Sequence, residues 1–194
     1  MTTTRLSATL AAIDQVNTQD PNQEQANGKS WPKELLYSQR MSDSLAAHFP
    51  EAPELLTIAA RAQHIGRWQI PRSDYPKTKP GYKQWRTELG KMHAEKTAEL
   101  MAAEGYSEED QARVKQLLTK RQLKSDELVQ TLEDVICLVF LQYYLDDFAN
   151  QHEHSKLIDI IQKTWHKMSA AGHAHALKLP LSEASLALVQ EALA

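Results

Sequence analysis

The chain has 194 residues, of which 42% are hydrophobic and 24% charged, the composition of an ordinary globular protein. A formal net charge of −3 gives no overall positive field, so nucleic acid is not favoured as a partner. The longest apolar run, residues 135–141, is far shorter than the roughly 20 residues that cross a bilayer, so no membrane partner is expected. The length predicts a single domain, residues 1–194, and the lack of a signal-peptide pattern predicts a cytoplasmic location.

Apolar residues recur at helical spacing along most of the chain, and prolines, glycines and capping residues interrupt that pattern. These signals predict helices at residues 5–17, 32–49, 53–65, 81–105, 107–124, 125–148, 157–168 and 182–193. Residues 18–31 are polar and are predicted to form a loop, and no segment shows sustained strand alternation. The fold class is therefore predicted to be all-α, a bundle of about seven to eight helices.

Positive charge gathers in one part of the sequence. Residues 61–96 contain nine Lys or Arg but only three Asp or Glu, and tryptophans and tyrosines lie among them. The stretch includes a loop, residues 67–80, that is long enough to suggest a function. A solvated basic face would explain this composition, and so would a site for an anion, because arginine suits phosphate or carboxylate. An anionic small molecule is the predicted ligand.

Histidines and buried acids supply the candidate chemistry. His64 ends an apolar helix just before Gly66, and His93 lies in the middle of the next predicted helix. Glu133 and Asp134 enter the most apolar helix, where an unpaired charge is costly and a metal, an arginine or hydrogen-bond donors must satisfy it. Two imidazoles and one carboxylate suit a transition metal with open positions.

The order of these motifs resembles the HD-domain superfamily of metal-dependent phosphohydrolases. The motifs are Ala62-Gln63-His64-Ile65-Gly66-Arg67, then His93-Ala94-Glu95, then Glu133-Asp134. The resemblance covers residues 32–148, which leaves an N-terminal helix and loop (1–31) and C-terminal helices (155–194) outside it. The chain departs from the superfamily pattern because Tyr37 stands at the first histidine position and Gln63-His64 replaces the His-Asp pair.

This resemblance implies an HD-like bundle holding one divalent metal ion, which could be Mn, Fe, Ni or Zn. By position, the metal ligands would be His64, His93 and Asp134. The implied activity is hydrolysis of a phosphorylated or nucleotide-like small molecule. The predicted catalytic residues are His64, Arg67, Lys96 and Glu133. The predicted substrate-binding residues are Tyr37, Gln63, Arg67, Trp68, Arg72, Tyr75 and Arg86.

Two other functions stay open at this point. The same fold could be a metal-free regulatory module that binds an anion, a nucleotide or an RNA end, or, less favoured, a non-haem iron oxygenase. Over its full length the chain also resembles the family called domain of unknown function 4202, through residues 20–22, 32–37 and 72–76. That resemblance gives a family without a mechanism, and the oligomeric state stays open.

Overall fold

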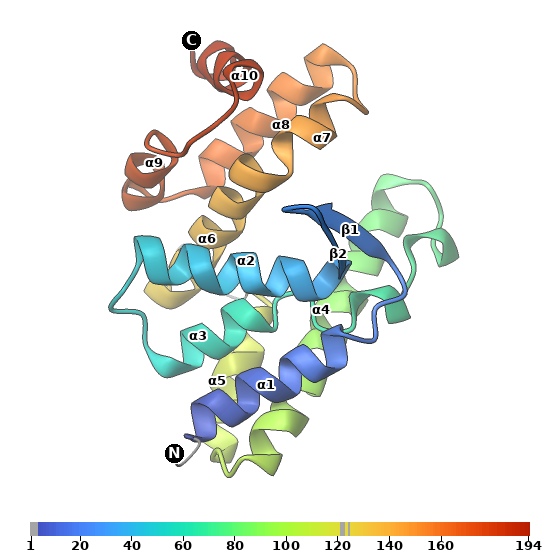
Figure 1. The fold of residues 1–194 in the computed structure, drawn as a ribbon, viewed down its shortest axis with the longest axis vertical. Helices are drawn as coiled ribbons and strands as arrows, with labels where there is room; N and C mark the ends of the chain where they lie inside the picture. The colour runs from blue at the N-terminus through green and yellow to red at the C-terminus, as the bar shows by residue number, and fades with distance from the viewer. Residues whose placement is uncertain (1–3, 121–122, 124) are drawn as a thin grey trace. The chain divides into compact units, whose positions relative to one another are not determined.

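The computed structural model describes residues 4–120, 123 and 125–194 (Figure 1). The chain groups into two compact units. Unit 1 consists of Met1–Ala46 and Pro50–Arg121, and unit 2 of Ala47–Phe49 and Gln122–Ala194. The regular secondary structure of the described part is helical apart from one short hairpin, so the predicted all-α class is confirmed. The single domain stays a prediction.

Unit 1 contains five helices in its described residues: α1 (Arg5–Asn17), most of α2 (Lys33–His48), α3 (Glu54–Arg61), α4 (Lys79–Ala103) and α5 (Glu108–Leu118). Helices α1 and α5 each pack against both α3 and α4. The helix starts follow the capping rule, since the side chains of Thr4, Thr78 and Ser107 accept hydrogen bonds from backbone N–H groups of the first turn. Capping and packing thus agree on where these helices begin.

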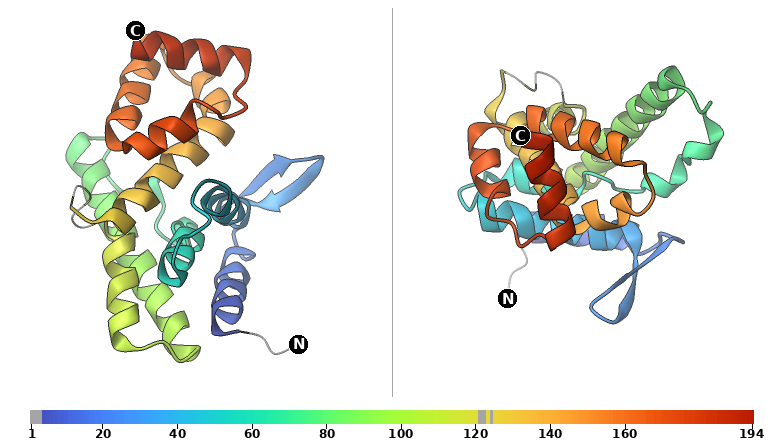
Figure 2. Two further views of the ribbon diagram at one scale, coloured as in Figure 1. Left: turned by 90° about the vertical axis from the view of Figure 1, so that its left-hand side faces the viewer. Right: turned by 90° about the horizontal axis from the view of Figure 1, so that it is seen from above.

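A β-hairpin stands where the sequence predicts a loop. Strands β1 (Gln23–Ala26) and β2 (Lys29–Pro32) pair antiparallel and project from the start of α2 (Figure 2). The two residues that join them, Asn27 and Gly28, have φ angles of 51° and 71°. This left-handed pair is the turn that joins short antiparallel strands, and Asn-Gly is its preferred sequence. The loop prediction for residues 18–31 is therefore wrong at the hairpin.

The segment between α3 and α4 is a loop with two single turns of 3-10 helix, η1 (Arg67–Gln69) and η2 (Arg72–Asp74). Helix α4 begins at Lys79, two residues earlier than predicted, because Thr78 caps it. Its first turn lies against the loop at Gly81, where an added Cβ would lie 2.4 Å from the carbonyl oxygen of Pro76. Only glycine permits this approach.

Unit 2 contains α6 (Glu127–Tyr143), α7 (Leu145–Ala149), α8 (His154–Lys167), α9 (Ala170–Ala176) and α10 (Glu183–Leu193) among its described residues. Helix α6 packs against α7, α8 and α9, and α10 packs against α7 and α8. A buried apolar cluster joins them: Cys137, Leu138, Leu141, Leu145, Ile161, Met168, Ala176, Val189 and Ala192. The single cysteine, Cys137, is buried in this cluster.

Several predicted helix limits differ from those of the structure. The predicted helix 125–148 is divided at Tyr144 into α6 and α7, and α8 begins at His154. Helix α9, which was not predicted, contains Gly172, and the Ser169 side chain caps this short helix by accepting from the Gly172 N–H. Helix α5 ends at Leu118, before the left-handed Lys120 (φ 53°). Arg121 and Lys124, which belong to the predicted helix 107–124, lie outside the described residues.

None of the described helices is both long enough and apolar enough to cross a bilayer. The cytoplasmic location stays a prediction.

Candidate functional site

The turn that follows α3 carries the candidate site of unit 1. Gly66 adopts a left-handed conformation (φ 64°), and its N–H donates to the Asn17 side chain of α1 at 3.1 Å. An added Cβ at Gly66 would lie 3.3 Å from Cε of Lys96 on α4, closer than most Cβ contacts. The turn is therefore fixed between α1 and α4, and it holds the neighbouring Gln63, His64 and Arg67 in place.

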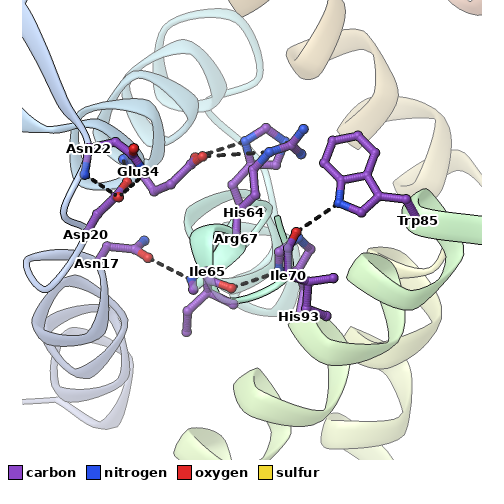
Figure 3. Close-up of polar contacts among 11 residues, drawn as sticks. Asn17, Asp20, Asn22, Glu34, His64, Ile65, Arg67, Ile70, Trp85 and His93 are labelled. Carbon is purple, nitrogen blue, oxygen red and sulfur yellow. Dashed lines mark hydrogen bonds and ion pairs between the residues drawn. The ribbon is translucent and has the colours of Figure 1, made fainter. Parts of the chain in front are cut away.

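His64 is held by a carboxylate on one side and a guanidinium on the other (Figure 3). Its Nδ1 lies 3.1 Å from Oε2 of Glu34 in α2, and its Nε2 lies 3.1 Å from Nη1 of Arg67. Because a guanidinium can only donate, Nε2 accepts, so Nδ1 carries the ring proton and donates to Glu34. The Nε of Arg67 lies 3.7 Å from Oε1 of the same carboxylate. The neutral imidazole thus has both nitrogens engaged.

Glu34 is placed by the start of α2. Its backbone N–H donates to Oδ2 of the buried Asp20 at 2.9 Å, and Oδ1 of Asp20 accepts from the backbone N–H of Asn22. Burial raises the pKa of the Glu34 carboxyl, and Arg67 lowers it to a smaller extent. Burial likewise lowers the pKa of His64 well below its usual value, and the positive charges of Arg67 and Arg86 act in the same direction. The imidazole is therefore neutral at physiological pH.

His93 lies next to this group. Its side chain is 4% exposed, and its Nδ1 donates to the Ile65 carbonyl oxygen at 2.8 Å. Its ring centroid lies 6.1 Å from that of His64, which stacks on Tyr37 with centroids 3.9 Å apart. Burial, and secondarily the nearby His64, lowers the pKa of His93 to about 3. His93 is thus a buried neutral ring, and His64 is a neutral ring whose side chain is 17% exposed.

These side chains border a pocket of about 310 Å³ in unit 1. Its lining residues come from the turn after α3, from α4 and from the end of α5: Gln63, His64, Arg67, Arg86, Thr87, Leu89, Gly90, Lys91, His93, Leu118, Thr119 and Lys120. Four of these described residues are Lys or Arg, and none is Asp or Glu. The pocket lining is therefore positively charged, and the carboxylate of Glu34 contacts two of its residues, Arg67 and His64.

An aromatic side chain fixes Arg67 at this pocket. The guanidinium carbon of Arg67 lies 4.7 Å from the ring centroid of Trp85, a cation–π arrangement. The indole N–H of Trp85 donates in turn to the Ile70 carbonyl at 2.9 Å, which ties α4 to the loop (Figure 3). Burial lowers the pKa of Arg67. Glu34 opposes this shift, and the positive charge of Arg86 lowers the pKa further, to a smaller extent. Two guanidinium groups that repel one another thus belong to one pocket.

Five of the residues predicted for the site line this pocket: Gln63, His64, Arg67, Arg86 and His93. The remaining ones in unit 1 have other surroundings. Arg72 donates to the carbonyls of Tyr75 and Pro76, and the hydroxyl of Tyr75 donates to Glu88, so both side chains hold the loop together. Tyr37, Trp68 and Lys96 are not among the described lining residues.

The two acids predicted from α6 belong to unit 2. Asp134, 1% exposed, accepts hydrogen bonds from Nε2 of Gln130 at 3.0 Å and from the backbone N–H of Ser169 at 2.8 Å, and also from the Ser169 hydroxyl. Oε1 of the buried Glu133 lies 3.6 Å from Nζ of Lys167. Hydrogen-bond donors of the same unit therefore satisfy Asp134, and Lys167 supplies a positive charge near Glu133.

The predicted metal site, His64 with His93 and Asp134, stays a prediction. Within residues 4–120, 123 and 125–194, no group of three or more His, Cys, Asp and Glu is arranged to hold a metal ion. A metal would also need a ring nitrogen of His64, and in this arrangement Glu34 and Arg67 engage both of them. The side chains as placed therefore fit a metal poorly.

Sequence reasoning did not identify several residues of the site. Glu34 precedes Leu35 and Leu36 at the start of a helix. An acid beside two leucines was the one local indication that its carboxylate is buried and needs a partner. Trp85 was noted only as one of the aromatic residues in the basic stretch. The other lining residues carry no local motif: Thr87, Leu89, Gly90, Lys91, Leu118, Thr119 and Lys120.

The fold and the site together define an all-α protein with a cationic pocket beside a largely buried Glu–His–Arg group. The family model described as Domain of unknown function (DUF4202) matches residues 7–189, and the chain belongs to this family. No curated protein and no solved structure matches the chain. The resemblance to the HD-domain superfamily is not confirmed by these comparisons.

Proposed function

We propose that the pocket of unit 1 binds a phosphorylated small molecule through its arginines and lysines. The observation that carries this proposal is the charge of the lining, four cationic residues and no acidic one among those described. Two guanidinium groups that repel each other are stabilised together when an anion enters between them. Phosphate is the anion that arginine matches best, because its oxygens can accept paired N–H donors.

The arrangement of Arg67 and Arg86 favours an anion-binding site over a solvated basic surface. Arg67 is already oriented by Trp85, Glu34 and His64, so little side-chain entropy is lost when a ligand binds it. Arg86 forms no hydrogen bond or ion pair with any residue in the described ranges, so its donors are available to a ligand. The pocket thus combines one fixed and one available guanidinium.

Replacing Arg86 with alanine is expected to weaken the binding of orthophosphate about tenfold, since a hydrogen bond to a charged group contributes about 1.5–3 kcal/mol. Titration calorimetry on the full chain at low salt would measure this. Lys83→Ala is the matched control, because Lys83 is an exposed cation on the same helix that does not line the pocket. Equal weakening in both variants would mean that general charge, and not this pocket, attracts the anion.

The His64–Glu34 pair supports hydrolysis of the bound phosphate ester as a second candidate function. A histidine whose Nδ1–H donates to a buried carboxylate presents Nε2 as a base. In the structure Arg67 donates a hydrogen bond to Nε2. A phosphate that attracts the guanidinium would break this hydrogen bond, and Nε2 could then accept from a water molecule. The added negative charge would also raise the pKa of His64, which makes it a better base.

Incubation with p-nitrophenyl phosphate, with and without Mn²⁺, tests this second candidate. Hydrolysis is expected to fall at least a hundredfold in His64→Gln, because general base catalysis contributes about 10²–10⁴ in rate. Arg86→Ala should instead act mainly by raising KM. Wild-type protein that binds phosphate but turns over no ester in either condition would leave binding as the function and remove hydrolysis.

A further inference from the structure

The pocket wall contains a buried amide with no partner. Gln63, next to His64 in the turn after α3, is 4% exposed and lines the pocket. Its Oε1 is buried and accepts no hydrogen bond from any residue that the structure describes. A buried polar atom left without a partner is destabilising, commonly by more than a surface hydrogen bond contributes. A ligand that donates to this oxygen would remove that cost when it binds.

The surroundings of Gln63 restrict the kind of donor. An ammonium group would approach Arg67 and Arg86, and like charges at such a distance repel. A hydroxyl group donates without carrying charge, so it can lie at the amide while a phosphate on the same molecule lies at the guanidinium groups. The hydroxyls of Thr87 and Thr119 in the lining donate to the backbone carbonyls of Lys83 and Lys115, so each can accept from a further hydroxyl of the ligand.

The size of the pocket limits the rest of the ligand. A volume of about 310 Å³ lies at the lower end of the range of roughly 300–1,000 Å³ found for small-molecule sites. That space exceeds what a phosphate group alone fills, but it suits a short ester better than a long one. We propose that the ligand of this pocket is a small hydroxylated phosphate ester, of the sugar-phosphate or polyol-phosphate class, with a hydroxyl donating to Gln63. This inference rests on the proposed function.

Three short esters of matched length test the inference on the full chain by titration calorimetry: glycerol 3-phosphate, propyl phosphate and 3-aminopropyl phosphate. Glycerol 3-phosphate is expected to bind about tenfold more tightly than propyl phosphate, and 3-aminopropyl phosphate more weakly than either. In Gln63→Leu the difference between the first two esters should disappear. Orthophosphate, titrated in parallel, measures the phosphate contacts separately from the hydroxyl contact.

Gln63→Leu is suited to this test because it removes the unpartnered amide and should fold with an unchanged or higher melting temperature. Gln63→Met is the second variant, with a flexible side chain of similar length that fills the same space. Equal affinities of glycerol 3-phosphate and propyl phosphate for the wild type would overturn the inference and leave phosphate binding in place. Failure of orthophosphate and of all three esters to bind would instead overturn the proposed function itself.

Discussion

Replacing Glu34 with glutamine is expected to lower the free energy of unfolding by about 3 kcal/mol at pH 7. The amide keeps the shape of the side chain and can still accept from Nδ1 of His64, but it removes the negative charge that faces Arg67. Arg67 is then a largely buried cation without its countercharge, which is the costly way to break an ion pair. The melting temperature should fall by about 6–12 °C, measured by circular dichroism.

Glu191→Gln is the control for this substitution. Glu191 pairs with His154 at 2.8 Å, but both side chains are more than half exposed, so the loss should stay below about 1 kcal/mol. Glu34→Gln should also bind orthophosphate more tightly than the wild type, because the pocket gains one net positive charge. A variant that is as stable as the wild type would show that solvent, and not Glu34, balances the charge of Arg67.

The part of the site that lies close together in the sequence was predictable. Gln63, His64 and Arg67 lie within five consecutive residues at the end of a predicted helix. Gly66, in the same segment, has the positive φ that a glycine at a helix end commonly adopts. Local signals also placed the cap at Ser107 and the start of α5. These features depend on neighbours in the chain, which a single sequence shows directly.

The partners of these residues were not predictable, because they come from distant segments. The Glu34 carboxylate is 30 residues away from His64, and nothing local to either residue pairs them. The superfamily resemblance implied Asp134 as a metal ligand, and the donors that contact its oxygens include Ser169, 35 residues later. Burial of an acid predicts that a partner exists, and only the packed structure shows which partner it is.

The hairpin was missed for a different reason. Strands of four residues are too short for alternation to be visible, and most of their side chains are polar. The Asn27-Gly28 pair was the one strong signal, and it was interpreted as part of a loop. Turn chemistry was therefore more informative here than hydrophobic pattern.

Lowering the pH from 7 to 4.5 is expected to destabilise the protein through its buried neutral histidines. The pKa of His93 is about 3 in the folded protein, against 6.5 in the unfolded chain. Between these two pH values the unfolded state binds more protons than the folded state. The contribution of His93 to the free energy of unfolding is therefore complete above pH 6.5 and is lost progressively toward pH 3. At about 1.4 kcal/mol per pH unit, His93 alone should account for about 3 kcal/mol at pH 4.5. Glu34, whose folded pKa is raised, acts in the opposite direction over the pH range above its usual value.

The variant His93→Asn isolates this contribution, because the asparagine amide can replace Nδ1 as the donor to Ile65 but does not titrate. Urea unfolding gives the free energy of unfolding at pH 7 and at pH 4.5. The decrease between the two pH values should be smaller by about 3 kcal/mol in His93→Asn than in the wild type. His166→Asn, at an exposed histidine, should follow the wild type. If His93→Asn loses as much stability as the wild type, then His93 is protonated in the folded protein, and the positive surroundings assigned to this pocket do not keep its histidines neutral.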